Sequence, residues 1–217
     1  MIKCAVFDLD GTLLNTLTTI AYYCNKSLEA LGLEPIETEK YKYFVGEGAA
    51  KLIHRILEYR AFSASAEREA EILNEYVSSY NKNPEYLTAV YNGIEPLLDR
   101  LSEEGISIAV LSNKPESSVK PLVEKFFGNE RFSIVSGQKE GVPRKPDPTA
   151  LFEILEKLGA TPEECLYIGD TSTDMKTGKA AGTFTVGVLW GFRDREELIE
   201  NGADFIAENP MQIAELI

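Results

Sequence analysis

The sequence predicts an α/β protein with a Rossmann-like parallel sheet core, flanked by helices, and an inserted all-helical cap domain. Short apolar runs alternate with helical stretches over most of the chain, which is typical of a parallel sheet with helices on both faces. Residues 15–88 interrupt this alternation, because they contain apolar residues at helical spacing and no strand-like run. In such a sheet the carboxyl ends of the strands share one edge, where these folds bind ligands.

The predicted strands are apolar runs of strand length, the pattern of strands that are buried on both faces. They are residues 2–7, 106–111, 131–135, 165–168, 184–189 and 204–207. The first run ends abruptly at Asp8-Leu9-Asp10-Gly11-Thr12. Two carboxylates close together at the end of a buried strand are costly unless a cation neutralises them. This pentapeptide is therefore the first candidate for a functional site.

The helices between the strands are recognised by their capping residues. Residues 94–104 have Pro96 near the start and Gly105 after the end, the usual placement of these two residue types. Further helix starts are expected at Asp147-Pro148, Asp194 and Asn209-Pro210, and a capping box with a short turn at Thr161-Pro162-Glu163-Glu164. Pro121 lies inside another helical pattern and is expected to bend it or to mark its start.

Residues 15–88 form the predicted cap. Apolar residues recur every three or four positions from Leu17 to Leu31, and Gly32 ends this first helix. Two further helical patterns lie around residues 52–57 and 72–80. We therefore expect two domains: a core of residues 1–14 and 89–217, and a cap of residues 15–88.

The chain has 217 residues and a net charge of −13. Because nucleic acids and anionic membranes bind basic surfaces, neither is expected as a partner. No apolar run approaches the roughly 20 residues that cross a bilayer, and Cys4, Cys24 and Cys165 lack C-x-x-C spacing. These features predict a cytoplasmic protein with buried, reduced cysteines. Such an acidic chain holds phosphate only through a local positive group, such as a metal ion, a lysine or a helix N-terminus.

Four groups of polar residues follow the predicted strands in a fixed order. They are Asp8, Asp10 and Thr12; then Ser112-Asn113; then Lys145; and finally Gly169-Asp170 with Asp174. Each group alone is an ordinary turn, cap or surface lysine. Together, on one edge of a sheet, they indicate a single site.

These four groups resemble the motifs of the haloacid dehalogenase-like hydrolase superfamily, and the resemblance covers essentially the whole chain. The helical insert is similar to the small helical cap of that family. The segments Gly187-Val188-Leu189-Trp190-Gly191-Phe192 and Val45-Gly46-Glu47-Gly48 resemble phosphoglycolate phosphatase-like members. The resemblance implies a Mg²⁺-dependent phosphoric monoester hydrolase that acts on a small, phosphoglycolate-like phosphorylated metabolite.

The chemistry of each residue type fits a role in that reaction. Asp8 is the expected nucleophile, which takes the phosphoryl group as an aspartyl-phosphate. Asp10, re-aimed by the turn at Gly11, is the expected general acid and base. Lys145 is expected to hold Asp8 and the transferring phosphoryl group together and to offset their charge.

Further residues are expected to bind Mg²⁺ and the phosphoryl oxygens. Oxygen ligands for Mg²⁺ are expected from Asp8, from the backbone carbonyl of Asp10 as in the family, and from Asp170. Asp174 is expected to act on a metal-bound water or on Lys145. The residues expected to bind phosphoryl oxygens are Thr12, Ser112, Asn113 through nearby backbone N–H groups, and Lys145.

Fewer conclusions follow for the cap. Gly46 and Gly48 form either a loop that selects the substrate or a plain turn between helices. Arg55 and Lys51 recognise a substrate carboxylate or belong to a solvated helix face. His54 is the single histidine and is more often structural than catalytic in such a setting. Asn15 stands where many relatives carry Asp, and we expect an effect on cap hinging or local geometry without loss of chemistry.

Several competing functions remain at this stage. Asp10 favours phosphate ester chemistry over a haloacid dehalogenase or a phosphonate hydrolase, neither of which depends on an acid there. A β-phosphoglucomutase-type sugar phosphate mutase keeps both acids, and an inorganic pyrophosphatase on the same scaffold is a further alternative. A binding protein that has lost turnover is disfavoured, because every expected reactive group is present. The sequence leaves the oligomeric state open.

Overall fold

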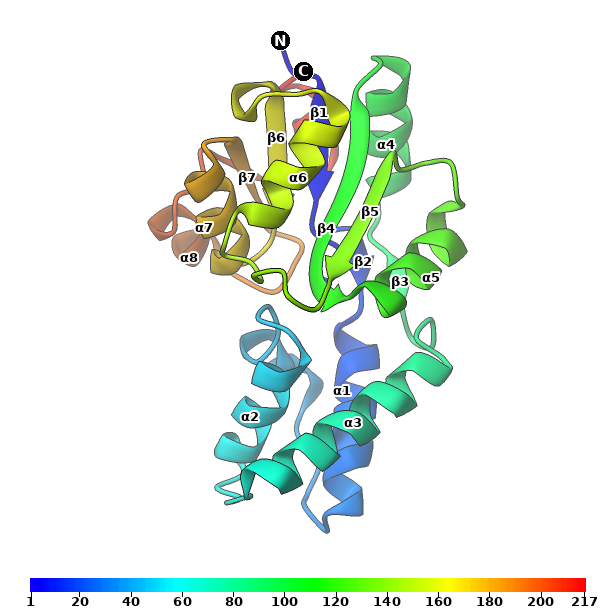
Figure 1. Ribbon diagram of the computed structural model, residues 1–217, viewed down its shortest axis with the longest axis vertical. Helices are drawn as coiled ribbons and strands as arrows, with labels where there is room; N and C mark the ends of the chain where they lie inside the picture. Colours follow the sequence, from blue (N-terminus) through cyan, green and yellow to red (C-terminus); the bar gives the residue numbers. More distant parts are fainter. The chain divides into compact units, whose positions relative to one another are not determined.

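A computed structural model describes all residues from Met1 to Ile217. The chain divides into two compact units, one of Met1–Asn15 with Val90–Ile217 and one of Thr16–Ala89 (Figure 1). The sequence-based boundaries lie one residue earlier at each crossing. Each unit is described by itself below, and the first is called the α/β unit and the second the helical unit.

The α/β unit is built on a six-stranded sheet in the order β5-β4-β1-β6-β7-β8, in which the paired strands are parallel. Its strands are β1 (Cys4–Phe7), β4 (Ser107–Pro115), β5 (Ile134–Gln138), β6 (Cys165–Gly169), β7 (Phe184–Val188) and β8 (Phe205–Ala207). Strand β1 is central, with β4 and β6 on either side. This order confirms the predicted α/β fold class with a parallel sheet.

Helices cover both faces of this sheet (Figure 1). They are α4 (Ile94–Glu103), α5 (Glu116–Phe127), α6 (Thr149–Leu158), α7 (Ser172–Ala181), α8 (Arg195–Glu200) and α9 (Met211–Ala214), with a 3-10 turn at Pro162–Glu164. Hydrophobic residues of α4, α5 and α9 join one buried cluster and those of α6 and α7 join another. The alternation of side chains along a strand supplies both clusters, because successive residues point to opposite faces.

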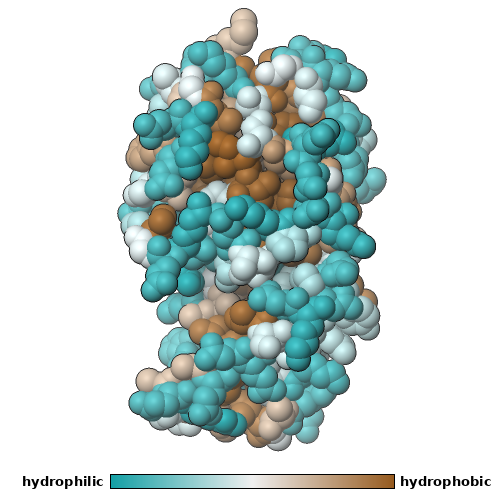
Figure 2. Space-filling view, turned by 45° about the vertical axis from the view of Figure 1, so that its right-hand side comes forward, coloured by the Kyte–Doolittle hydropathy of each residue, from teal (hydrophilic) through white to brown (hydrophobic).

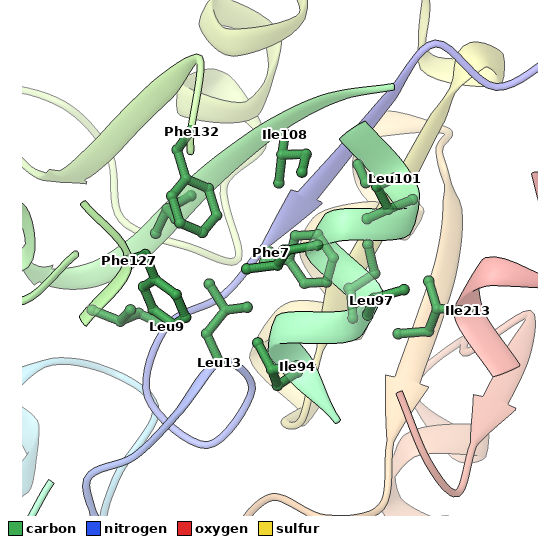
Figure 3. Close-up of a cluster of buried hydrophobic side chains, with 14 of the residues drawn as sticks. Phe7, Leu9, Leu13, Ile94, Leu97, Leu101, Ile108, Phe127, Phe132 and Ile213 are labelled. Atoms are coloured by element: carbon green, nitrogen blue, oxygen red, sulfur yellow. The ribbon is translucent and has the colours of Figure 1, made fainter. Parts of the chain in front are cut away.

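Figure 3 shows the larger of these two clusters, on the face that α4 and α5 cover. Phe7 of β1 packs among Leu97 and Leu101 of α4, with Ile108 of β4 beside them. On the opposite face Cys4 and Val6 pack with residues of α6, such as Leu151. Since β1 is buried on both sides, its position is fixed up to the residue where the acidic pentapeptide begins.

The helical unit contains three helices, α1 (Leu17–Ala30), α2 (Ala49–Tyr59) and α3 (Ala66–Lys82), and a 3-10 helix, η1 (Thr38–Tyr43). Helix α3 contacts both α1 and α2, and η1 packs on α1. Leu28, Ile53 and Ile72 from the three α-helices are buried. The hydroxyl of Tyr41, which is fully buried, donates to Asn25 Oδ1 at 2.7 Å. The all-helical prediction for this part of the chain therefore describes its interior well.

Two local features differ from the sequence-based expectation. Strand β5 (Ile134–Gln138) begins three residues later than the sequence predicted. The reason is that Phe132, which precedes the strand, packs into the hydrophobic cluster. Two short paired strands, β2 (Leu14–Asn15) and β3 (Ala89–Val90), lie where the chain passes between the units. Runs of two residues carry no readable alternation, so the sequence did not predict them.

Figure 2 shows one face of the molecule, where hydrophobic residues lie between hydrophilic ones. Scattered exposed apolar residues such as Phe152 and Ile199 are ordinary for a globular protein. None of the helices is long and apolar enough to span a membrane. All three cysteines are buried and unpaired, as expected.

Candidate active site

The parallel sheet gathers the predicted site residues at the carboxyl ends of three neighbouring strands. Phe7 of β1 lies in register with Val110 of β4 and with Ile168 of β6. The residues that follow each strand therefore emerge at the same level of the sheet. These residues are Asp8 and Asp10 after β1, Ser112 and Asn113 within the end of β4, and Asp170 after β6.

Asp8 lies at the centre of this group and is almost completely buried. Its backbone N–H donates to Ile168 O at 2.8 Å, which continues the pairing of β1 with β6. Its Oδ1 lies 2.9 Å from Lys145 Nζ. Burial raises the pKa of Asp8 to about 7; the Lys145 ammonium opposes this rise, and the Asp174 and Asp10 carboxylates add to it. Burial thus favours the protonated form of Asp8, and Lys145 favours the ionised form.

Lys145 is buried, and its ammonium group lies close to three oxygen atoms. Its Nζ lies 2.9 Å from Asp8 Oδ1, 2.7 Å from Asp174 Oδ1 and 3.0 Å from the backbone oxygen of Leu111. Burial by itself would lower the pKa of Lys145, but Asp174 and Asp8 raise it well above its ordinary value. The lysine thus carries a permanent positive charge against two carboxylates.

Asn113 positions Lys145 through its side-chain amide. Its Oδ1 accepts from Lys145 N at 3.0 Å, and its Nδ2 donates to Lys145 O at 3.1 Å. Ser112 is also buried, and its Oγ accepts from Lys114 N at 3.2 Å. Since that oxygen acts as acceptor, the hydroxyl proton of Ser112 is available for an oxygen of a ligand.

Asp174 belongs to the first turn of α7 and is held by four donors. Its Oδ2 accepts from Thr171 Oγ1 at 2.6 Å and from Thr171 N at 3.1 Å, which closes a capping box. Its Oδ1 accepts from Lys145 Nζ and, at 3.4 Å, from Tyr167 OH. These bonds use both of its oxygens, and one of them holds Lys145 in place.

Asp170 is fully buried and lies between two loops. Its Oδ1 accepts from Thr12 Oγ1 at 3.0 Å, and its Oδ2 accepts from Phe192 N at 2.9 Å. Burial raises the pKa of Asp170 well above its ordinary value, and the Asp174 and Asp8 carboxylates raise it further. Because Thr12 gives its one hydroxyl proton to Asp170, this side chain supports the carboxylate in the present arrangement.

The turn after β1 approaches Asp170 so closely that only glycine fits. Gly11 has a φ of +87°, and a Cβ there would collide with the Asp170 carboxylate. Gly11 N donates to Leu14 O at 2.8 Å, and Leu9 O accepts from Leu13 N and Leu14 N. This tight turn changes the direction of the chain directly after Asp10, as the sequence suggested.

Asp10 is partly buried and pairs with Lys114, a residue that sequence reasoning did not single out. Lys114 Nζ lies 2.8 Å from Asp10 Oδ1. Lys114 directly follows Ser112-Asn113 in β4, so its position at the strand end was the available signal. A lysine in such a place is usually solvated, and only the pairing of β4 with β1 shows its partner.

The loop after β7 makes contacts in the site that the sequence did not predict. Trp190 Nε1 donates to Thr12 O at 2.9 Å, and a Cβ at Gly191 would collide with Asp170 and with the backbone oxygen of Gly11. Together with Phe192 N, this loop holds Asp170 and the Gly11 turn in place. The segment stood out in the sequence by resemblance, but its contacts depend on tertiary structure.

The expected cap residues lie in the helical unit. Gly48 is the residue before α2 and has a φ of +87°, and Gly46 also has a positive φ. Arg55 on α2 donates to Phe44 O at 3.1 Å and pairs with Glu47, so its guanidinium ties down the loop that contains both glycines. His54 Nδ1 lies 3.2 Å from Glu69 Oε1 on the exposed side of the helices.

The donor set of the α/β unit fits a divalent cation. One carboxylate oxygen from each of Asp8, Asp170 and Asp174 lies within 4.8 Å of the others. Four carboxyl groups, those three and that of Asp10, lie around two lysines, Lys145 and Lys114. Buried like charges are unstable without a counterion, and an all-oxygen site suits a hard dication such as Mg²⁺.

Comparison with known proteins agrees with this arrangement. The chain is 32% identical over 212 residues to a phosphoglycolate phosphatase of Aquifex aeolicus, covering 98% of this chain and 95% of that protein. It is 31% identical over 210 residues to a phosphoglycolate phosphatase of Pseudomonas putida, covering 96% and 74% of the two chains. A solved structure from Lactobacillus delbrueckii subsp. bulgaricus, provisionally named phosphoglycolate phosphatase, matches with a TM-score of 0.93 and 30% identity over 99% of this chain and 98% of that one.

The family profile described as haloacid dehalogenase-like hydrolase matches residues 5–188. This match spans the α/β unit from β1 to β7 and includes the four groups of site residues and the helical unit. Fold, order of motifs and relatives agree, and the chain belongs to the haloacid dehalogenase-like hydrolase family.

Proposed function

We propose that this hydrolase is a Mg²⁺-dependent phosphatase that cleaves a small, phosphoglycolate-like phosphomonoester through an aspartyl-phosphate intermediate. The observation that carries the proposal is the buried Asp8 carboxylate at the end of the central strand, held at 2.9 Å by Lys145. Phosphatase relatives at 31–32% identity support the class of phosphoric monoester hydrolase.

In the first half of the proposed reaction, a carboxylate oxygen of Asp8 attacks the phosphorus atom. A bond forms between Asp8 and phosphorus, and the bond from phosphorus to the ester oxygen breaks. Asp10 gives its proton to that leaving oxygen, so the alcohol departs neutral. Lys145, which already pairs with Asp8, offsets the charge of the nucleophile and of the phosphoryl group.

In the second half, Asp10 takes a proton from a water molecule as that water attacks the phosphorus of the aspartyl-phosphate. The bond between Asp8 and phosphorus breaks, inorganic phosphate leaves, and Asp8 returns to its carboxylate form. Asp10 again holds the proton it began with, so atoms and charges balance over the cycle.

The residues proposed to hold Mg²⁺ are Asp8, Asp10 through its backbone carbonyl, and Asp170, with Asp174 acting on Lys145. A bound dication supplies charge neutralisation for the phosphoryl oxygens and for the clustered carboxylates. The acidic cluster of the α/β unit supports this assignment.

The phosphoryl oxygens are proposed to be bound by Ser112, by Lys145 and by backbone N–H groups near Thr12 and Asn113. Ser112 is favoured among the side chains, because its hydroxyl proton is not needed within the protein. Asn113 contributes through the backbone, since its side-chain amide is used by Lys145.

We assign substrate selection to the helical unit, residues 15–88 by the sequence-based boundaries, as a cap. The loop with Gly46 and Gly48 is the proposed selecting element, and Arg55 holds that loop through Phe44 and Glu47. A small phosphorylated metabolite in the cytoplasm is the proposed substrate, and neither nucleic acid nor membrane is a proposed partner.

The proposal is tested with purified protein and a panel of phosphorylated metabolites, with Mg²⁺ and after its removal with a chelator. We expect release of inorganic phosphate from phosphoglycolate-like monoesters that requires Mg²⁺ and is lost in Asp8→Asn. Isomerised sugar phosphate without phosphate release would instead indicate a mutase, and preferential cleavage of pyrophosphate would indicate a pyrophosphatase. Full activity of Asp8→Asn would refute the nucleophile assignment.

A further inference from the structure

We propose that Lys114 is a positioning residue that holds the Asp10 carboxylate in place for proton transfer to the leaving oxygen. The inference rests on the proposed function. It adds that the pair of Lys114 and Asp10 decides how well the enzyme cleaves esters of poor leaving groups, such as alkyl phosphates.

The contact itself is close and sheltered. Lys114 Nζ lies 2.8 Å from Asp10 Oδ1, and the two side chains are only 10% and 13% exposed. Ion pairs between exposed side chains contribute little, since water competes for both partners and the flexible chains lose entropy. A pair shielded to this degree keeps its geometry better, because water reaches neither group freely.

Both ends of the pair are aimed by local backbone structure. The pairing of β4 with β5 is irregular between Leu111 and Pro115, and within this segment the Lys114 N–H donates to Ser112 Oγ. Such irregularities re-aim side chains beside active sites. On the other strand the tight turn at Gly11 redirects the chain directly after Asp10. Two separate backbone features therefore bring these side chains together.

Lys114 is the lysine that pairs with Asp10, and Lys145 is engaged elsewhere. Lys145 Nζ already donates to Asp174 and to the Leu111 carbonyl, and it lies 2.9 Å from Asp8 Oδ1. The site therefore provides one lysine for the nucleophile and a second for the proton-transferring acid. Because Lys114 occupies only Oδ1 of Asp10, the second carboxylate oxygen is left for the leaving oxygen of the substrate.

This arrangement predicts a dependence on the leaving group. An alkoxide leaves only if it is protonated as the bond breaks, whereas p-nitrophenolate is stable as an anion and needs no acid. Loss of Lys114 lets the Asp10 carboxylate rotate away from the leaving oxygen, and the cost falls on alkyl esters. The parameter kcat/KM reports this step, because it ends with departure of the alcohol.

The test compares Lys114→Met with wild type on p-nitrophenyl phosphate and on alkyl phosphomonoesters, with Mg²⁺ present. We expect kcat/KM for the alkyl esters to fall by about 10-fold or more, as part of the 10²–10⁴-fold that a general acid supplies, and the value for p-nitrophenyl phosphate to stay nearly unchanged. The matched control is Lys120→Met, which removes an exposed lysine paired with Glu116 on α5. If Lys114→Met does not fold, Lys114→Gln takes its place.

A double mutant shows whether Lys114 acts through Asp10. In the Asp10→Asn background, Lys114→Met should cause no further loss on alkyl esters, because the group it positions is already gone. The inference would be overturned if Lys114→Met lowered kcat/KM for alkyl esters as much in the Asp10→Asn background as in wild type. It would also be overturned if the single variant Lys114→Met lowered kcat/KM equally for both ester types. If wild type cleaves neither ester, the proposed function fails; if wild type is active and Lys114→Met slows both esters alike, only this inference fails.

Discussion

The side-chain amide of Asn113 bonds both backbone polar groups of Lys145, at 3.0 Å to its N–H and 3.1 Å to its carbonyl. Asn113 lies near the end of β4, in its irregular segment, and Lys145 lies in a loop 32 residues further along the chain. A short polar side chain at a strand end thus fixes the backbone of the lysine that pairs with Asp8. We therefore expect Asn113 to matter for activity through Lys145, without contact between its side chain and the substrate.

Replacing Asn113 with Ala should weaken both stability and turnover. Two buried backbone groups of Lys145 lose their partners, which costs about 1–3 kcal/mol for each group left unsatisfied. Urea unfolding and steady-state kinetics measure the two effects. Asn129→Ala, which removes an exposed amide bonded to Glu124, is the matched control and should change neither. Unchanged kcat in Asn113→Ala would show that Lys145 is held by other contacts.

Asp10→Asn should slow turnover by about 10²–10⁴-fold, because an amide can neither give nor take the proton that a general acid and base transfers. Steady-state release of phosphate from an alkyl phosphomonoester measures the effect. Asp99→Asn, at a surface carboxylate that pairs with Arg131, is the control and should keep wild-type rates. An unchanged rate for Asp10→Asn would mean that another residue carries the proton.

Asp170→Ala should abolish stabilisation by Mg²⁺. A ligand that binds only the folded state stabilises it, by about 2.7 kcal/mol at 100 times its Kd. Thermal unfolding with increasing Mg²⁺ should therefore raise the Tm of wild type and leave that of Asp170→Ala nearly constant. Asp99→Ala should respond as wild type does. An equal rise in Asp170→Ala would place the cation elsewhere, whatever the effect on activity.

The stability of the metal-free protein should depend on pH through Asp8. Its pKa in the folded state is about 7, against an ordinary value of 3.8, so the folded state keeps a proton that the unfolded state has released. Between these two values the free energy of unfolding falls as pH rises, by a few kcal/mol for a shift of this size. Urea unfolding in chelator from pH 4 to 7 should show this fall in wild type.

The variant Asp8→Asn isolates that contribution, because an amide does not titrate. Its free energy of unfolding should fall less over the same pH range, and the difference from wild type should widen towards pH 7. Parallel curves for the two proteins would show that Asp8 keeps its charge in the metal-free fold.

The sequence predicted the sheet and most of the polar residues that gather at its edge, for an identifiable reason. Strands such as Cys4–Phe7 and Cys165–Gly169 are apolar on both faces, so their ends are easy to locate, and the polar residues after them stand out. The capping box at Thr161–Glu164 was also predicted, and the structure confirms it. Local chemistry of this kind needs no tertiary information.

The sequence did not predict the contacts that aim the site residues. Lys114, Trp190 and the side-chain role of Asn113 depend on which strands are neighbours, and the paired residues lie far apart in the chain. Thr12 was expected to bind phosphate, and its hydroxyl bonds to Asp170 in the structure. A hydroxyl has several possible acceptors, and only the fold shows which one is within reach.

The most direct test of the account is a search for phosphate bound covalently to Asp8. Protein in excess over a labelled phosphomonoester, with Mg²⁺ present, is quenched in acid within the first turnover, digested and analysed by mass spectrometry. The account predicts a base-labile phosphoryl group on the peptide that contains Asp8, which builds up before phosphate is released and is absent in Asp8→Asn. Substrate turnover without any phosphorylated peptide, or with the phosphoryl group on another residue, would contradict it.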